Sequence, residues 1–205
     1  MNPLVITGVG SRSTPSEVLA QMEAIGVWAL ENQVAVRSGH AEGADWAFEK
    51  GAQEYCIAYL PWPSFNDHLI SQARRVVYRS TPESQALVTQ THPAPEKLSQ
   101  GAWKLHGRNT WQVLGSQLSV PSRALVCWTP KGAEVGGTAT AIALAQAHQI
   151  PVYNLALISY EEVLVRLVAL QEGREVRACD LPPQPGDDKP VGDTEITWGE
   201  LFGRK

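Results

Sequence analysis

The sequence has too little positive charge and too few cysteines for several classes of protein, and its apolar runs are short. Its 17 Lys and Arg residues are outnumbered by 21 Asp and Glu residues, which gives a formal net charge of −4. Proteins that grip long stretches of nucleic acid are usually basic, because phosphate neutralisation supplies much of their affinity. The charge balance therefore argues against an extended nucleic-acid interface, although it is compatible with a local basic patch.

Cysteine is scarce, and its spacing is not that of a metal site. The three cysteines are far apart and form no CxxC pair. Cys56 and Cys127 lie in apolar, strand-like runs, so we interpret them as buried thiols rather than ligands or nucleophiles. The histidines show no HxxxH or HxH spacing. The sequence therefore predicts neither a metal site nor a bound cofactor.

Long apolar segments are also missing. No run reaches the roughly 20 residues of a membrane span, and the first residues lack the basic and apolar regions of a signal peptide. We therefore expect a soluble, cytoplasmic protein with no membrane partner. Since 43% of its 205 residues are hydrophobic, the chain can still bury a core as one domain.

What the sequence does contain is an alternation of strand and helix patterns. Short β-prone runs are separated by segments with helical spacing of apolar residues. The runs predicted as strands are residues 4–8, 34–36, 56–60, 124–128 and 151–155. This order predicts an α/β fold: a Rossmann-like parallel sheet of five or more strands, flanked by helices and joined by right-handed crossovers.

Local signals predict where some helices begin. Thr14 and Glu17 form a capping-box pattern before the first helix, and Ser159 and Glu162 form another before the last. Residues 67–78 are predicted as a further helix. We assign residues 1–178 to a nucleotide-binding domain. Because residues 179–205 are rich in Pro, Gly and Asp, we expect there a flexible tail with a short docking segment.

Glycine-rich loops follow three of the predicted strands, at residues 8–12, 38–45 and 129–139. In an open parallel sheet, ligands bind beyond the carboxyl ends of the strands. Free backbone N–H groups and helix N-termini at that edge suit a phosphate. The loops therefore predict a nucleotide or nucleotide-derived ligand. The loop residues predicted to bind it are Gly8, Gly10, Ser11, Arg12, Ser38, Gly39, His40, Gly43, Ala44, Asp45, Thr129, Gly136, Gly137 and Thr138.

The charged loop residues each have two interpretations. The guanidinium of Arg12 suits bidentate pairing with phosphate, or an ordinary surface ion pair. Asp45 could orient a ribose or act as a base, or simply favour the dipole of the helix it begins. Glu42 would repel phosphate, so it is better placed for a sugar or base. Asp45 and Glu42 are the catalytic candidates.

Ring side chains in these regions are equally ambiguous. His40 and His106 could donate hydrogen bonds to a ligand, although a lone loop histidine is more often structural. Trp62, in the proline-flanked turn after residues 56–60, is the best candidate for stacking on a base.

Four motifs, GVGSR, SGHAEGADWAFEKGA, HGRNTWQVLG and GGTATAIALAQAHQIPVYNL, occur in family order. Together they resemble the Rossmann-like SLOG superfamily, which includes the DNA-processing protein A and Lonely Guy families. Gly43, Ala44 and Asp45 match the SGxARGID-type motif of DNA-processing protein A. His106-Gly107-Arg108-Asn109 looks like its Arg-Asn motif, which implies ligand roles for Arg108 and Asn109. The resemblance covers residues 4–155, in the style of small, stand-alone phage or bacterial members.

Two departures from these families bear on function. Glu42 stands where DNA-processing protein A has a basic residue, so we expect weak DNA binding at most. The Lonely Guy motif PGGxGTxxE supplies a catalytic glutamate, whereas no acid follows Thr138 at residues 139–141. Nucleotide binding is thus the favoured function. A nucleoside 5′-phosphate N-glycosidase and a single-stranded DNA binder are the alternatives, and the sequence leaves open both enzymatic activity and a homo-oligomer.

Overall fold

A computed structural model describes residues 4–134, 136–177 and 180–182. Its centre is a six-stranded sheet in which every neighbouring pair is parallel, with the order β4-β3-β2-β1-β5-β6. The strands are β1 Val5–Gly8, β2 Ala35–Ser38, β3 Cys56–Leu60, β4 Arg74–Val77, β5 Ala124–Cys127 and β6 Val152–Asn154. The strand order reverses between β1 and β5, as in doubly wound folds. The predicted α/β class is therefore confirmed, and the predicted tail lies almost wholly outside the described residues.

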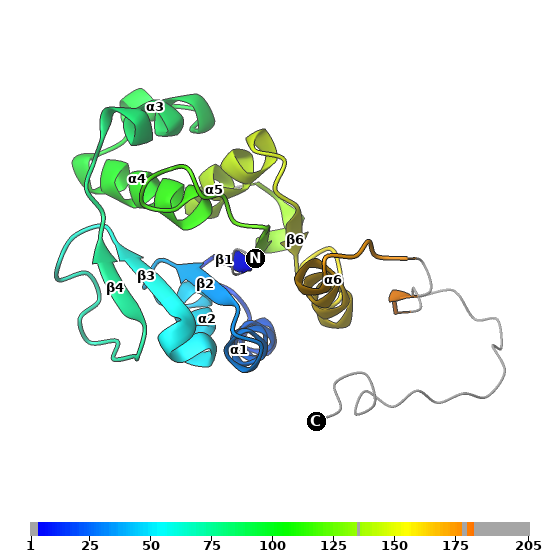
Figure 1. The fold of residues 1–205 in the computed structure, drawn as a ribbon. Coiled ribbons are helices and arrows are strands. Elements are labelled where there is room, and N and C mark those ends of the chain that lie inside the picture. Colours follow the sequence, from blue (N-terminus) through cyan, green and yellow to red (C-terminus); the bar gives the residue numbers. More distant parts are fainter. Residues whose placement is uncertain (1–3, 135, 178–179, 183–205) are drawn as a thin grey trace, which may run out of the picture.

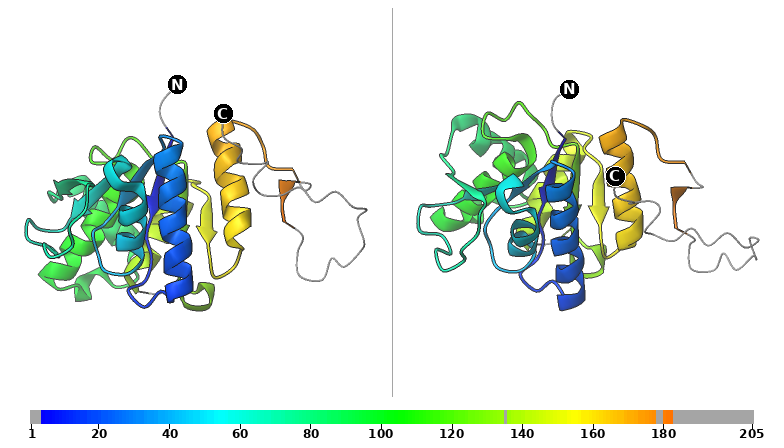
Figure 2. Two further views of the ribbon diagram at one scale, coloured as in Figure 1. Left: turned by 90° about the horizontal axis from the view of Figure 1, so that it is seen from below. Right: turned by 60° about the horizontal axis from the view of Figure 1, so that its bottom comes forward.

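Helices cover both faces of the sheet (Figures 1 and 2). One face carries α1, α2 and α6, and the other carries α4 and α5, with α3 against α4. The helices are α1 Ser16–Glu31, α2 Ala44–Ala52, α3 Pro82–Thr91, α4 Gln100–Leu114, α5 Gly136–Ala147 and α6 Tyr160–Glu172. None of the helices in the described part of the chain is both long and apolar enough to cross a membrane.

Strand β5 shows how the sequence builds the two layers. Successive side chains of a strand point to opposite faces. Ala124 and Val126 accordingly pack in the core beneath α1, α2 and α6, while Leu125 and Cys127 pack beneath α4 and α5. Burial raises the pKa of the Cys127 thiol to about 12, and Cys56 is buried too. The prediction of buried thiols at these two positions is confirmed.

The predicted helix over residues 67–78 is wrong. Arg74–Val77 forms the edge strand β4, which pairs in parallel with β3 from Ile57↔Arg74 to Leu60↔Val77. Three of these four residues are exposed, so apolar periodicity gave little signal there. Pairing with β3 decides the conformation, because strand preference depends more on tertiary context than on local sequence.

The two predicted capping boxes have different outcomes. Helix α1 begins at Ser16 after Pro15 and has no side-chain cap. Thr14 instead donates its hydroxyl to the carbonyl of Ser11 at 2.7 Å, so the first capping prediction is wrong. Ser159 does accept a hydrogen bond from the backbone of Glu162 at 3.2 Å, which confirms the cap of α6.

Candidate functional site

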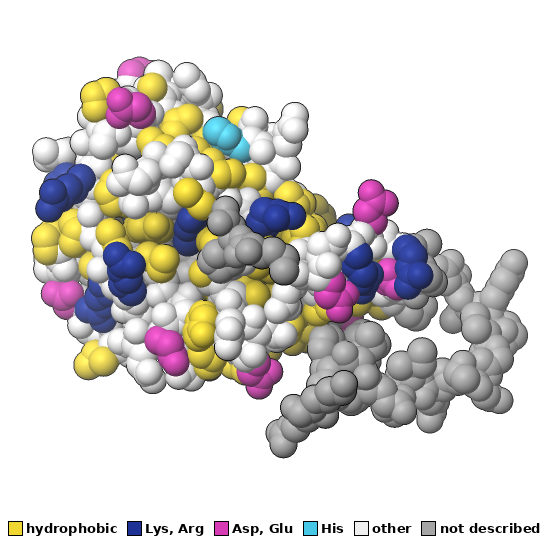
Figure 3. Space-filling model, viewed as in Figure 1, with side chains coloured by type: hydrophobic (Ala, Val, Ile, Leu, Met, Phe, Trp, Pro, Cys, Tyr) yellow, Lys and Arg dark blue, Asp and Glu magenta, His cyan; other side chains and the backbone are white. Residues whose placement is uncertain are grey.

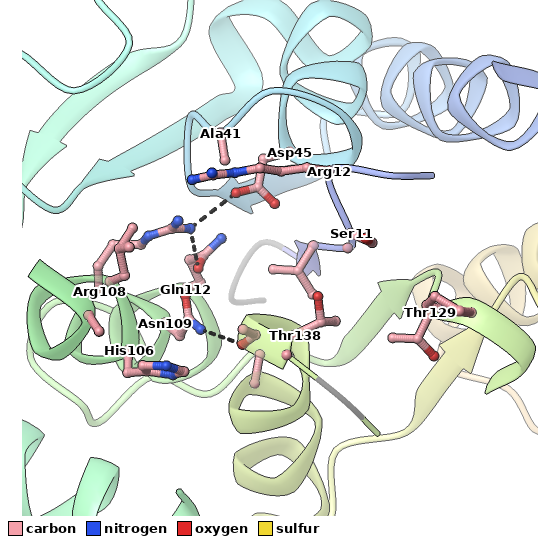
Figure 4. A pocket seen from close by; sticks show the side chains of 18 residues that line it. Ser11, Arg12, Ala41, Asp45, His106, Arg108, Asn109, Gln112, Thr129 and Thr138 are labelled. Atoms are coloured by element: carbon pink, nitrogen blue, oxygen red, sulfur yellow. Dashed lines mark hydrogen bonds and ion pairs between the residues drawn. The ribbon is translucent and has the colours of Figure 1, made fainter. Parts of the chain in front are cut away.

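The three glycine-rich loops meet at the carboxyl edge of the sheet around a cavity of about 470 Å³ (Figure 4). The cavity lies beside the reversal between β1 and β5, where open α/β sheets bind ligands. The convergence predicted from the sequence is therefore confirmed. Its lining includes Gly10, Ser11, Arg12, Asp45, Arg108, Asn109, Thr129, Gly136, Gly137 and Thr138.

Helix α4 forms a further wall of the cavity. It contributes Leu105, His106, Arg108, Asn109 and Gln112, which recur at intervals of three and four residues. Residues at this spacing share one side of a helix. The sequence indicated Arg108 and Asn109 through the family resemblance, but it gave no reason to select Gln112. The signal that could have found it is its position four residues after Arg108, which places both on one side of the helix.

A buried polar network forms the floor of the cavity. Arg108 donates from Nη1 to a carboxylate oxygen of Asp45 at 3.1 Å and to Oε1 of Gln112 at 2.7 Å. Burial raises the pKa of the Asp45 carboxyl, and the charge of Arg108 opposes that rise. Burial lowers the pKa of the Arg108 guanidinium, and Asp45 opposes that change in turn. Each group thus compensates the buried charge of the other.

Gly39 makes room for this network. A Cβ at Gly39 would lie 1.3 Å from Nη1 of Arg108, which is far inside contact distance. Gly43 has a φ of +86° and packs against the backbone of Arg12. These two glycines are therefore explained by packing and backbone conformation within the protein.

Six of the predicted loop residues lie behind the cavity wall rather than on it: Gly8, Ser38, Gly39, His40, Gly43 and Ala44. His40 is fully buried, and its Nδ1 lies 2.9 Å from a carboxylate oxygen of Glu49. Ser38 donates its hydroxyl to the carbonyls of Gly8 and Asp45. In this structure these side chains hold the loop in place and do not face the cavity.

The mouth of the cavity is built differently. Gly136 and Gly137 are exposed, and a Cβ on either would meet nothing within 4 Å. Asn109 donates from Nδ2 to the carbonyl of Gly137 at 2.9 Å, which ties the first turn of α5 to α4. Arg12 is exposed and lines the same cavity, where its side chain lies near Ala41 and Asp45, across from the start of α5 (Figure 4). Among the described residues this side chain has no hydrogen-bond or ion-pair partner.

The balance of charge in the cavity is positive. Two guanidinium groups, those of Arg12 and Arg108, face one carboxylate, that of Asp45. The charge of Arg12 is near enough to contribute to the lowered pKa of Arg108. A negatively charged ligand group would relieve this excess.

His106 enters the cavity as a neutral ring. Its Nδ1 lies 2.9 Å from Oγ1 of Thr140, and its ring packs edge-on against that of His92 at 4.7 Å. Burial lowers the pKa of His106 to about 4, with smaller contributions from the charges of His92 and Arg108. At neutral pH the ring can therefore form a hydrogen bond with a ligand but carries no charge.

Two other candidates lie outside the cavity lining. Glu42 is exposed and contacts Nε2 of His68 at 3.0 Å. Trp62 packs edge-on against Phe65 at 5.0 Å, in the small apolar cluster that also contains the cavity residue Leu105. Asp45 is thus the only carboxylate that lines the cavity among the described residues. No three His, Cys, Asp or Glu side chains in that part of the chain are grouped to hold a metal ion.

Comparisons with known proteins identify the fold. No protein-family model matches the sequence, and no curated protein matches it significantly. A solved structure of DNA processing protein A from Helicobacter pylori, described for its single-stranded DNA binding mode, matches with a TM-score of 0.53 and 16% sequence identity. The match covers 74% of this chain and 65% of the other, so the chain spans less than two thirds of that relative. The chain therefore shares a Rossmann-like fold with DNA processing protein A.

Proposed function

We propose that the protein binds a nucleotide or nucleotide-derived ligand, with a phosphate held between Arg12 and the first turn of α5. The observation that carries this proposal is the open space at Gly137, in the same cavity as Arg12, whose side chain has no partner among the described residues. No residue in the described part of the chain packs where a side chain at Gly137 would stand. A glycine there serves a ligand that approaches the backbone closely.

The chemistry of the mouth suits a phosphate. The first N–H groups of a helix have no partner within the helix, and the helix dipole adds positive potential at that end. Phosphate oxygens accept from such groups, while the guanidinium of Arg12 can pair with two oxygens at once. A volume of about 470 Å³ is within the range of ordinary small-ligand sites.

A thermal-shift screen tests the proposal. Nucleoside mono-, di- and triphosphates, cyclic nucleotides and ADP-ribose are compared with the matching nucleosides, which lack phosphate. We expect at least one phosphorylated ligand to raise the melting temperature, because a ligand at ~100 times its Kd adds about 2.7 kcal/mol of stability. The matching nucleoside should shift it far less. Equal shifts for nucleotide and nucleoside, or no shift with any ligand at millimolar concentration, would refute the phosphate site.

Because Asp45 lines the cavity, the N-glycosidase is a second function to test. Cleavage of an N-glycosidic bond develops positive charge on the sugar, which a nearby carboxylate stabilises. Asp45 lines the cavity but is engaged by Arg108, and α5 carries no acid from Thr138 to Ala141. We therefore expect that the protein releases no substantial amount of free base from nucleoside monophosphates. Chromatography of the reaction mixture measures the released base. Release at enzymatic rates that Asp45→Asn abolishes would make the protein an enzyme.

The fold likeness to DNA processing protein A favours single-stranded DNA as an alternative ligand. However, Lys and Arg side chains are scattered over the face drawn in Figure 3 and form no continuous stripe there, so this face offers no basic track for a DNA backbone. The chain also carries a net charge of −4. We expect weak binding that salt suppresses steeply. Tight binding of an oligonucleotide at physiological salt, measured by fluorescence anisotropy, would favour the DNA-binding alternative instead.

A further inference from the structure

The floor of the cavity contains hydrogen-bond donors that the protein does not use. Nε2 of Gln112 and Nε of Arg108 are buried and have no hydrogen-bond partner among the described residues. Both side chains line the cavity. Buried polar groups in folded proteins are nearly always paired, and an unpaired one calls for a specific explanation. A ligand that supplies the missing acceptors is such an explanation.

The orientation of the Gln112 amide is fixed by Arg108. Oε1 of Gln112 accepts the hydrogen bond from Nη1 of Arg108 at 2.7 Å. The reverse orientation would set the amide N–H groups against a guanidinium, which has donors only. The NH₂ group is therefore turned away from Arg108 and toward the cavity (Figure 4).

The acceptors of the floor are already engaged. The side-chain carbonyl of Gln112 and the carboxylate of Asp45 both accept hydrogen bonds from Arg108. The backbone N–H of Ala41 also donates to Asp45. Within the network of Asp45, Arg108 and Gln112, the buried side-chain atoms that have no partner at all among the described residues are N–H donors. The part of the ligand that reaches this network must therefore present lone pairs.

Exposure indicates which end of a nucleotide reaches the floor. Arg12, Gly136 and Gly137 are exposed at the mouth, whereas Gln112 is 0% and Arg108 5% exposed. A phosphate is the most strongly hydrated part of a nucleotide, so it belongs at the mouth, and the base then points inward. The walls along its path include apolar side chains that suit the flat faces of a base, those of Ala41, Ala102, Leu105 and Ala141.

We infer that Gln112 is a specificity-determining residue that selects a 6-oxopurine base, and this inference rests on the proposed phosphate site at the mouth. A 6-oxopurine presents two acceptors, O6 and N7, the kind of group that the two unused donors of Gln112 and Arg108 require. Adenine presents a donor, its 6-amino group, in place of O6. Against this floor that amino group would face N–H groups and leave them unpaired.

IMP and AMP provide the sharpest test, because they differ only along one edge of the base: IMP has a 6-oxo group and an N1–H, whereas AMP has a 6-amino group and an unprotonated N1. By isothermal titration of the whole protein, we expect IMP to bind at least about tenfold more tightly than AMP, as sites built to pair with a polar group reject ligands that lack it. Gln112→Glu keeps an oxygen for Arg108 but replaces the NH₂ donor with an acceptor. The preference for IMP should then disappear or reverse.

Two further variants isolate the role of the donor. Gln85→Glu makes the same change at an exposed position of α3 and should leave the preference for IMP intact. Gln112→Met removes the donor without adding charge, and it should also abolish the preference if Gln112→Glu fails to fold. Circular dichroism and thermal unfolding establish that each variant is folded.

The results separate this inference from the function on which it rests. Equal binding of IMP and AMP by the unmodified protein would overturn the role of Gln112, yet leave the phosphate site standing. A preference for IMP that survives in a folded Gln112 variant would overturn it as well. If neither nucleotide binds at millimolar concentration, and no other nucleotide does, the proposed function and the inference are both wrong.

Discussion

Two loops of this protein carry similar glycine-rich sequences and use them for opposite purposes. In residues 38–45, the backbone is enclosed: Gly39 leaves room for the Arg108 guanidinium, and Gly43 packs against a neighbouring loop. In residues 129–138, Gly136 and Gly137 face open space and solvent. The first loop builds the floor of the cavity, and the second leaves its mouth open. A glycine motif therefore locates a site, while the packing around each glycine tells what that residue does there.

The largest effect expected from this difference is on stability. Gly39→Ala should lower the free energy of unfolding by about 3 kcal/mol or more, because the added methyl displaces Arg108 from its buried ion pair. Gly137→Ala should change it by less than about 0.5 kcal/mol, since its methyl meets nothing. Urea denaturation of both variants measures the two values. Equal losses would contradict the contrast between the loops.

Gly101→Ala is the matched control for Gly137→Ala. A Cβ at Gly101 also meets nothing within 4 Å, yet Gly101 does not line the cavity. We expect nucleotide binding to weaken in Gly137→Ala and to stay unchanged in Gly101→Ala. Weakening in both would show that the effect does not arise at the mouth.

The loop of residues 38–45 carries two carboxylates that differ in burial. Asp45 is buried against Arg108, whereas Glu42 is exposed beside His68. Asp45→Asn should cost about 2–3 kcal/mol of unfolding free energy, because it leaves the Arg108 charge buried without a counter-ion. Glu42→Gln should cost less than about 0.5 kcal/mol, as expected for an exposed pair. Chemical denaturation at neutral pH distinguishes them, and a small loss for Asp45→Asn would show that the floor network is not held by charge.

A smaller effect is expected where the two walls of the cavity touch, at the contact between His106 of α4 and Thr140 of α5. The unfolded chain takes up a proton on this ring as the pH falls through about 6.5, whereas the folded protein does so only near 4. Stability contributed by neutral His106 is therefore lost as the pH falls from about 6.5 toward 4.

His106→Gln should accordingly reduce the drop in melting temperature between pH 7.5 and pH 5, relative to the unmodified protein. His68→Gln is the control, because His68 is exposed. An identical pH dependence in the His106 variant and the unmodified protein would contradict the burial of a neutral ring at this position.

The sequence predicts the fold well where burial leaves a pattern. Strands such as Cys56–Leu60 are buried on both faces, and the predicted segment coincides with β3. Strand β4 was not predicted, because its conformation depends on pairing with β3 rather than on its own exposed residues. Thr14 likewise fits a capping pattern, but it bonds back into its own loop.

The candidate site could also be predicted only in part. Position after a strand predicts which loops converge, and the loops do converge. It does not predict which way each side chain points, so His40, buried against Glu49, could not be told from the cavity residue Asp45. Gln112 could not be selected from the sequence, because its environment is created by Arg108 and by Asp45, which lies 63 residues before Arg108 in the chain.

The proposed phosphate site depends most on Arg12, and a comparison of two arginine variants by titration tests this role most directly. Arg12→Ala is compared with Arg123→Ala, which removes the same side chain from an exposed position just before β5, outside the cavity lining. The ligand is the nucleotide that gives the largest thermal shift, and isothermal titration calorimetry measures its affinity for each folded variant.

We expect Arg12→Ala to weaken binding by about 1.5–3 kcal/mol, the range for a hydrogen bond to a charged group. Arg123→Ala should leave the affinity unchanged. Both variants should keep the melting temperature of the unmodified protein without ligand, because neither arginine is buried. Affinity that is unaltered in Arg12→Ala, or that falls equally in both variants, would contradict a phosphate site at the mouth of this cavity.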